Sequence, residues 1–149
     1  MSTRSLFALA ALMMFPNVAR AQSAADTVAI RAAVSDYVEG FYQGDTIRFN
    51  RSIRRDIHKF GFMRDHATGR YTGSKMSWQY FLESAEEVRN GTDKAPPNAQ
   101  RTIELLDVMD QVAVAKLTAL WGIDYLTLGK YDGKWMIQQV MWQTHPSKH

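Results

Sequence analysis

The stretch WGIDYLTLGKYDGKWMIQQVMWQTH, residues 121–145, decides the fold. Two segments rich in β-branched and aromatic residues flank the dipeptide Asp132-Gly133, which is typical of a two-residue hairpin turn of type I′. Such a turn fixes the register of the two strands, so Tyr131 is expected to pair with Lys134. The stretch therefore predicts an antiparallel hairpin.

Side chains of a strand alternate between two faces, so the register divides the hairpin into two sides. Asp124 falls on the face that is expected to form the core. A carboxylate buried there without a partner is costly and tends to stay protonated, a state in which it donates a hydrogen bond. The alternative is that Asp124 is solvated at the strand end, or satisfied by a backbone amide or Gln143. The expected core face carries Asp124, Leu126, Leu128, Trp135, Ile137, Gln139, Met141 and Gln143, and the other face carries Trp121, Ile123, Tyr125, Thr127, Met136, Val140 and Trp142.

The rest of the chain predicts helices followed by strands. Apolar residues recur at helical spacing in two segments, and Asp45 is a candidate N-cap for a short helix between them. Residues 90–100 have the composition of a flexible loop. The expected helices are 26–43, 46–53 and 78–89, the expected extended segment is 57–63, residues 65–75 are a loop or irregular hairpin, and the later strands are 101–109, 112–121, 123–131 and 134–144.

This order of elements predicts an α+β fold. The N-terminal helices are expected to pack on the concave face of a cone-shaped, curved antiparallel sheet and to close an apolar interior suited to a small molecule. The convex face would then expose an apolar, aromatic surface, which predicts a homodimer through that face. If the two faces are reversed, the Leu126 face forms the dimer and Asp124 leaves the pocket.

The N-terminus predicts a cleavable signal peptide. Arg4 is followed by an apolar stretch at residues 5–15, too short to span a bilayer, and Ala19-Arg20-Ala21 fits an A-x-A cleavage site. Cleavage after Ala21 removes 21 of the 149 residues and leaves a single domain of 128, residues 22–149. The expected location is therefore periplasmic or secreted; the alternative is a retained N-terminal anchor.

Composition and charge exclude several classes of function. The chain has no cysteine, which rules out disulfides and thiolate chemistry. Its net charge of +3 falls to +1 when Arg4 and Arg20 leave with the signal peptide, so neither a nucleic-acid partner nor a membrane partner is expected. The basic stretch around Arg48 and Arg55 predicts a solvated helix face or, alternatively, an anion-attracting rim. No two histidines stand at a metal-ligand spacing, so neither a metal nor a cofactor is expected.

In these features the chain resembles the nuclear transport factor 2-like superfamily and, within it, the group named putative lumazine-binding. The likeness covers about residues 28–144 and rests on three segments in order: VSDYVEGFYQGD, AVAKLTALWGIDYLTLGK, and DGKWMI followed by VMW. It implies a cone-shaped α+β fold that is usually dimeric. It leaves the activity open, because such cones host enzymes, binding proteins and adaptors.

A more distant resemblance is to the ketosteroid isomerases, which share this fold. Their oxyanion hole uses a Tyr on the first helix and a protonated Asp on a late strand. Tyr37 precedes Gly44-Asp45 as that Tyr precedes a Gly-Asp helix end, and Asp124 follows Ile123 as the acid follows an Ile. The resemblance therefore implies Tyr37 and Asp124 as paired oxyanion donors.

The general base of those isomerases has no clear counterpart here. Their Asp base lies in the extended segment after the second helix, where this chain offers Asp56, His58 and Lys59. His58 has the more suitable unperturbed pKa, near 6.5, and Asp56 is the weaker candidate. Gln139 and Trp121 are the further candidate ligand-binding residues.

Three functions follow from these patterns. The first is an exported protein that binds a small apolar or aromatic ligand through a carbonyl, enolate or phenolate-like oxygen, held by Tyr37 and Asp124. The second is an enzyme of isomerase, cyclase or dehydratase type, with His58 or Asp56 as its base. The third is a dimeric interaction module whose cone is packed shut.

Overall fold

The computed structural model describes the backbone of residues 17–146 and the side chains of residues 24–146. Residues 1–16 of the predicted signal peptide lie outside this range, and the predicted cleavage site after Ala21 falls within the first helix. In chain order, the elements are α1 (Asn17–Gln43), α2 (Thr46–Ser52), β1 (Ile53–Arg64), β2 (Tyr71–Met76), α3 (Trp78–Arg89), β3 (Arg101–Val108), β4 (Val112–Ala119), β5 (Gly122–Tyr131) and β6 (Lys134–Gln143).

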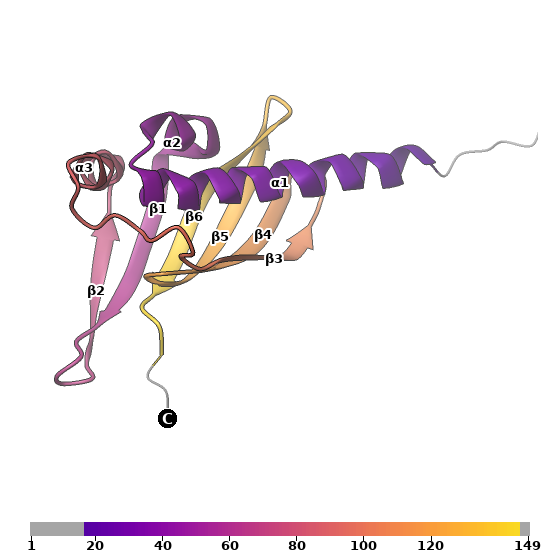
Figure 1. Cartoon of the computed structure of the whole chain (residues 1–149). Coiled ribbons are helices and arrows are strands. Elements are labelled where there is room, and N and C mark those ends of the chain that lie inside the picture. Colours follow the sequence, from indigo (N-terminus) through magenta and orange to yellow (C-terminus); the bar gives the residue numbers. More distant parts are fainter. Residues whose placement is uncertain (1–16, 147–149) are drawn as a thin grey trace, which may run out of the picture.

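The strands form one curved sheet in the order β2-β1-β6-β5-β4-β3, and the helices lie along one side of it (Figure 1). Helix α1 crosses β6, β4 and β3, whereas α3 packs on β1 and β2. The predicted α+β cone is therefore confirmed. The sheet is mixed, because β1 pairs with β6 in parallel while all other neighbours are antiparallel.

Side-chain caps set the starts of the two shorter helices. The Asp45 carboxylate accepts hydrogen bonds from the backbone of Ile47 (2.9 Å) and Arg48 (3.3 Å). The Ser77 hydroxyl accepts one from the backbone of Tyr80 (3.3 Å). Each cap satisfies amide donors that have no partner within the first helical turn, so both helices begin where their sequence predicts.

Helix α1 is longer than its apolar pattern predicts, since it begins at Asn17 and not near Asp26. Asp26 instead accepts hydrogen bonds from Lys130 Nζ (2.7 Å) and Trp135 Nε1 (2.9 Å). These bonds, chiefly the one from Lys130, lower the pKa of the Asp26 carboxyl, while burial opposes them. Asp26 therefore fastens α1 to the β5–β6 hairpin.

The hairpin turn has the predicted geometry, but the register shifts beyond it. Asp132 and Gly133 both have positive φ, 49° and 80°, as a type I′ turn requires, and Tyr131 pairs with Lys134. Leu128 still pairs with Ile137, whereas Thr127 pairs with Gln139. Gln138 is thus an extra residue in β6, a β-bulge.

The bulge reverses the faces of the last part of β6. Gln139 and Met141 were expected on the core face, but they are exposed. Val140 and Trp142 were expected on the outer face, but they are buried in the core. That part of the prediction is wrong because a single extra residue moves every later side chain to the opposite face. Along β5, and along β6 as far as Ile137, the core face holds the residues predicted for it: Asp124, Leu126, Leu128, Trp135 and Ile137.

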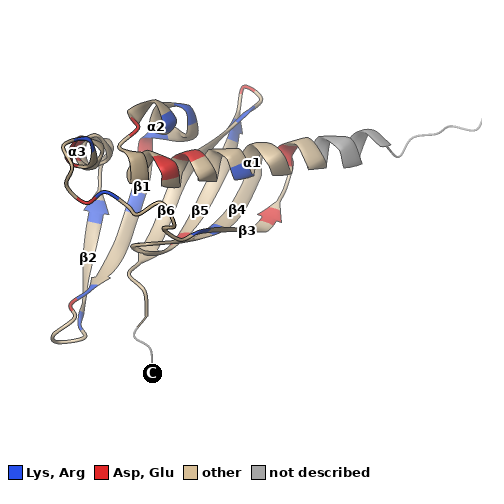
Figure 2. Cartoon of the chain, viewed as in Figure 1, with Lys and Arg blue, Asp and Glu red and all other residues tan. Residues whose placement is uncertain are grey.

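Acidic and basic residues are interspersed over the helices and strand ends (Figure 2). Asp36 of α1 binds both Arg48 (2.8 Å) and Arg51 of α2, and Arg54 pairs with Asp56 at 3.2 Å. Three arginines of the basic stretch are therefore in ion pairs within the chain, while Arg55 donates a hydrogen bond to Asn50 Oδ1 (3.3 Å). Within residues 17–146, no helix is long and apolar enough to cross a membrane.

Candidate functional site

Three buried polar side chains meet beneath α1: Tyr37, Lys59 of β1 and Asp124 of β5. Lys59 Nζ donates a hydrogen bond to the Tyr37 hydroxyl (2.6 Å), which donates to Asp124 Oδ2 (2.6 Å). Trp121, in the turn between β4 and β5, donates from Nε1 to Asp124 Oδ1 (2.9 Å). Tyr37 and Asp124 have no exposed surface, and Lys59 is 3% exposed. The chain of bonds therefore links two buried, opposite charges through one hydroxyl.

Alternation along β1 explains how a lysine enters the interior. Ile57, Lys59 and Gly61 are all buried, whereas His58 between them is exposed. Two-residue periodicity therefore carries Lys59 to the helix-covered face. Tyr37 reaches the same place from the apolar stripe of α1.

The Lys59 ammonium lies among aromatic rings. A cation within about 6 Å of a ring centroid is attracted by the negative face of the ring. This attraction and the carboxylate charge offset part of the cost of removing the ammonium from water. The distances from Nζ to the ring centroids are 4.8 Å for Phe41, 5.1 Å for Tyr37, 5.4 Å for Phe81, 5.7 Å for Trp142 and 5.8 Å for Trp121.

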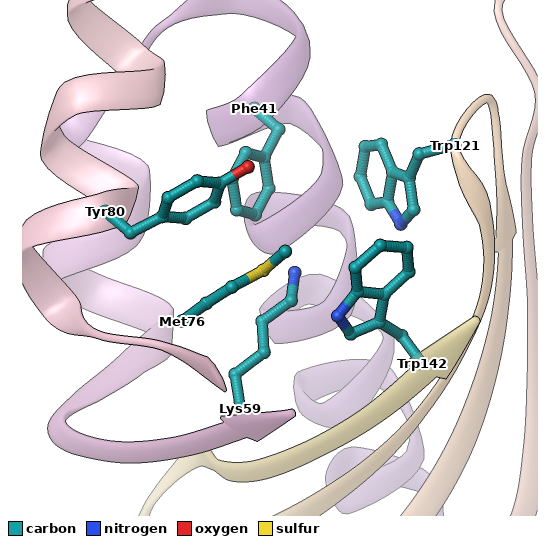
Figure 3. Close-up of a pocket in the computed structure, with 6 residues that line it drawn as sticks. All are labelled: Phe41, Lys59, Met76, Tyr80, Trp121 and Trp142. Carbon is teal, nitrogen blue, oxygen red and sulfur yellow. The ribbon is translucent and has the colours of Figure 1, made fainter. Parts of the chain in front are cut away.

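A cavity of about 120 Å³, the inner cavity, adjoins the ammonium. In Figure 3 the Lys59 side chain extends into the space between Met76 and two indoles. One of these indoles, Trp142, has a buried Nε1 with no hydrogen-bond partner among the described residues. The inner cavity thus has a largely apolar wall that includes Lys59 and the Trp142 indole. Its lining consists of Phe41, Lys59, Met76, Tyr80, Trp121 and Trp142.

Gly61 makes room for the Trp142 indole. The two residues pair across β1 and β6, and a Cβ atom at position 61 would overlap the indole ring. A residue without a side chain is required for the ring to lie across β1 in this way. Gly61 therefore helps to place Trp142 at the inner cavity.

Burial and nearby charge determine how firmly Tyr37 and Lys59 hold their protons. The pKa of Tyr37 is raised well above its usual value, first by burial and then by the negative charge of Asp124, so the hydroxyl keeps its proton. Burial lowers the pKa of the Lys59 ammonium, and the charge of Asp124 opposes that effect. Loss of the Lys59 proton is therefore easier than for a lysine in water.

A second, wider cavity of about 480 Å³, the outer cavity, adjoins the inner one. Both are lined by Phe41, Tyr80 and Trp121. Glu87 of α3, together with residues 93–95, adds charged groups to its wall. The predicted loop at 90–100 thus forms part of the wall of the outer cavity.

The structure brings the two predicted oxyanion residues together in a different arrangement. Tyr37 and Asp124 are in direct contact, but they bond to one another and neither lines the inner cavity. Asp124 accepts hydrogen bonds at both oxygens, so it does not have the donor role that its apolar surroundings suggested. Trp121 does line the cavity, as expected of a ligand-binding residue.

The other predicted residues lie away from the inner cavity. His58 and Gln139 are exposed partners across β1 and β6, on the face opposite Lys59. Asp56 is exposed and paired with Arg54. Neither His58 nor Asp56 is positioned as a base for this cavity, and the bulge at Gln138 removes Gln139 from it.

Of the six residues that line the inner cavity, only Trp121 belongs to the predicted site, and Lys59 and Trp142 are among the five that do not. For Lys59 the signal exists, because Ile57 and Gly61 stand two residues away on either side. For Trp142, the bulge that turns it inward has no mark in the sequence. Among the described residues no cluster of three or more His, Asp or Glu side chains is arranged to hold a metal ion.

Comparison with known structures agrees with this architecture. An NTF2-like protein of unknown function from Shewanella baltica OS155 is 23% identical, with a TM-score of 0.64 over 83% of this chain and 97% of its own. An NTF2-like protein with a cystatin-like fold from Novosphingobium aromaticivorans is 12% identical, with a TM-score of 0.61 over 91% of this chain and 94% of its own. These likenesses establish the nuclear transport factor 2-like fold.

The family is identified by sequence. The family model described as "Putative lumazine-binding" matches residues 25–143, and the chain belongs to this family. No curated protein sequence is detectably similar to the chain.

Proposed function

We propose that this protein binds a small ligand in the inner cavity, through an oxygen that accepts hydrogen bonds from Lys59 and Trp142. The observation that carries the proposal is the pairing of these two buried donors beside one apolar cavity. A buried N–H without an acceptor costs free energy. A ligand oxygen that accepts its hydrogen bond would remove that cost. Lys59 and Trp142 thus have the ligand-binding role that the sequence predicted for Tyr37 and Asp124.

The size and charge of the site narrow the class of ligand. An engineered apolar cavity of about 150 Å³ holds one benzene, so the inner cavity of about 120 Å³ suits a single ring or a fragment of similar size. Asp124 already balances the charge of Lys59, which favours a carbonyl or a partly charged enolate or phenolate-like oxygen. Larger substituents of the ligand would extend into the outer cavity.

The enzyme hypothesis has less support than binding. An isomerase, cyclase or dehydratase needs a base within hydrogen-bond reach of its substrate. His58 and Asp56, the residues proposed for that role, are exposed away from the inner cavity. The geometry therefore favours a binding protein over an enzyme that depends on either of them.

Acetophenone, a single ring bearing a carbonyl, tests the binding proposal. It should raise the melting temperature and quench the tryptophan fluorescence saturably, while ethylbenzene, which lacks the oxygen, should bind more weakly. Lys59→Met should weaken binding by about 1.5–3 kcal/mol and Trp142→Phe by about 1 kcal/mol, the usual net worth of charged and neutral hydrogen bonds.

Tyr125→Phe, on the exposed side of β5, is the matched control and should leave the affinity unchanged. Equal affinity for acetophenone and ethylbenzene, or an unchanged affinity in both cavity variants, would contradict the proposed donors.

We also propose a homodimer through the outer face of the sheet. Phe60, Met141 and Tyr125 lie side by side across β1, β6 and β5, and Met141 and Tyr125 are 41% and 50% exposed. Exposed apolar residues that adjoin one another are typical of an interface. The helices cover the opposite face, so a dimer formed here would leave both cavities open.

Light scattering of the purified protein tests the dimer. The unmodified chain should have the mass of two chains, and Met141→Asp should have the mass of one, because a two-fold interface would bury the new charge twice. Val28→Asp, on the exposed side of α1, is the control and should remain a dimer. A monomeric unmodified protein contradicts this proposal.

We propose further that the protein acts outside the cytoplasm, in the periplasm or after secretion. The support is the basic residue, apolar stretch and A-x-A site of residues 1–21. N-terminal sequencing of the exported protein should begin at Gln22. A chain that keeps Met1 and stays in the cytoplasm would contradict the expectation.

A further inference from the structure

Lys59 differs from the ion-paired lysines of the chain in what its amine touches. Lys130 and Lys116 form direct ion pairs with carboxylates, at 2.7 and 3.0 Å. Lys59 Nζ is hydrogen-bonded to a neutral phenol, and the Asp124 carboxylate lies one hydroxyl further away. A carboxylate in direct contact with an ammonium favours the charged form of the amine. A phenol in that position favours it less, so the amine of Lys59 can more easily become neutral.

The surroundings of Lys59 are those of a reactive amine. Its Nζ is buried among aromatic rings and borders a cavity with space for one ring. Lysines that are desolvated in an apolar pocket lose their proton more readily and act as nucleophiles toward carbonyl carbon. Burial lowers the pKa of Lys59 in this way.

We propose that Lys59 forms a reversible imine with the carbonyl carbon of a small aromatic or apolar aldehyde held in the inner cavity. This inference rests on the proposed binding function and specifies its ligand as an aldehyde. It assigns Lys59 a covalent role in addition to that of a hydrogen-bond donor.

The step balances without an oxidant or a reductant. The Nζ lone pair attacks the carbonyl carbon, the electrons of the C=O π bond move to oxygen, and a proton passes from nitrogen to that oxygen to give a carbinolamine. The nitrogen lone pair then forms the C=N bond, and the hydroxyl leaves as water with the proton that the Lys59 ammonium first gave up through Tyr37 to Asp124. The protonated imine thus keeps the positive charge of the ammonium, and Asp124 is again a carboxylate. Hydrolysis is the reverse of these steps.

Tyr37 is the residue placed to move these protons. Its hydroxyl lies 2.6 Å from Lys59 Nζ and 2.6 Å from Asp124 Oδ2, so it can accept a proton from nitrogen while giving its own to the carboxylate. The charge of Asp124 and the ring faces would also stabilise a protonated imine. Tyr37 and Asp124 thereby assist imine formation, although neither residue lines the cavity.

Reductive trapping of the imine tests the inference. The full-length mature protein is incubated with benzaldehyde and sodium cyanoborohydride near pH 7, and the modified lysines are located by peptide mass mapping. Lys59 should be benzylated about tenfold faster than exposed Lys75, because a bound aldehyde has a high effective concentration at the amine. Acetophenone should slow modification of Lys59 and leave that of Lys75 unchanged.

Because both lysines are compared within the unmodified chain, the result does not depend on whether a variant folds. Lys75→Met is the control variant and should retain the fast site, whereas Lys59→Met should lose it. Modification of Lys59 no faster than that of Lys75 overturns the imine. In that case, saturable quenching of tryptophan fluorescence by benzaldehyde would leave the binding proposal standing, and the absence of quenching would overturn both.

Discussion

The burial of the Lys59 ammonium opposite the Asp124 carboxylate, with the Tyr37 hydroxyl between them, is the constraint on which the rest of the structure depends. The three side chains come from β1, β5 and α1, so their hydrogen bonds form only when these two inner strands and the helix have come together. Bringing either charge alone into the interior costs roughly several kcal/mol. The paired arrangement thus favours one way of packing the helix on the sheet.

The same constraint accounts for the inner cavity. Apolar side chains fill most of the space under α1, where Leu117, Leu126, Leu128 and Ile137 have no exposed surface. Around Lys59, flat aromatic rings replace branched aliphatic chains, and rings that turn their faces or edges toward one ammonium leave space between them. The Trp142 indole lines this space, and its buried N–H has no acceptor among the residues that the structure describes. The cavity therefore combines an apolar wall with two polar lining residues, Lys59 and Trp142, as sites for small ligands commonly do.

Much of the fold could be predicted from residues whose effect is local. The Asp132-Gly133 turn, the cap at Asp45, the start of the third helix after Ser77, and the helical stripe that contains Tyr37 all depend on a few neighbouring residues, and each is present as predicted. Asp124 could be placed on the core face because the extra residue lies in β6, so alternation along β5 continues unbroken from the turn to Asp124.

Features that depend on distant contacts could not be predicted. No residue type marks the bulge at Gln138 or the parallel pairing of β1 with β6, which joins strands far apart in the chain. Burial of Lys59 runs against the strong tendency of lysine to stay exposed, and only the carboxylate and rings gathered from other elements make it possible. The interior cation and the indole donor therefore became evident only in three dimensions.

The two buried charges stabilise one another, and a double-mutant cycle measures this interdependence directly. Urea unfolding of Lys59→Met and Asp124→Asn should each show a loss of about 3–5 kcal/mol, because each leaves one buried charge uncompensated. The double variant, which buries neither charge, should lose less than the sum of the two by about 1–3 kcal/mol. Losses that add within about 0.5 kcal/mol would mean that Lys59 and Asp124 are energetically independent, and would contradict the account.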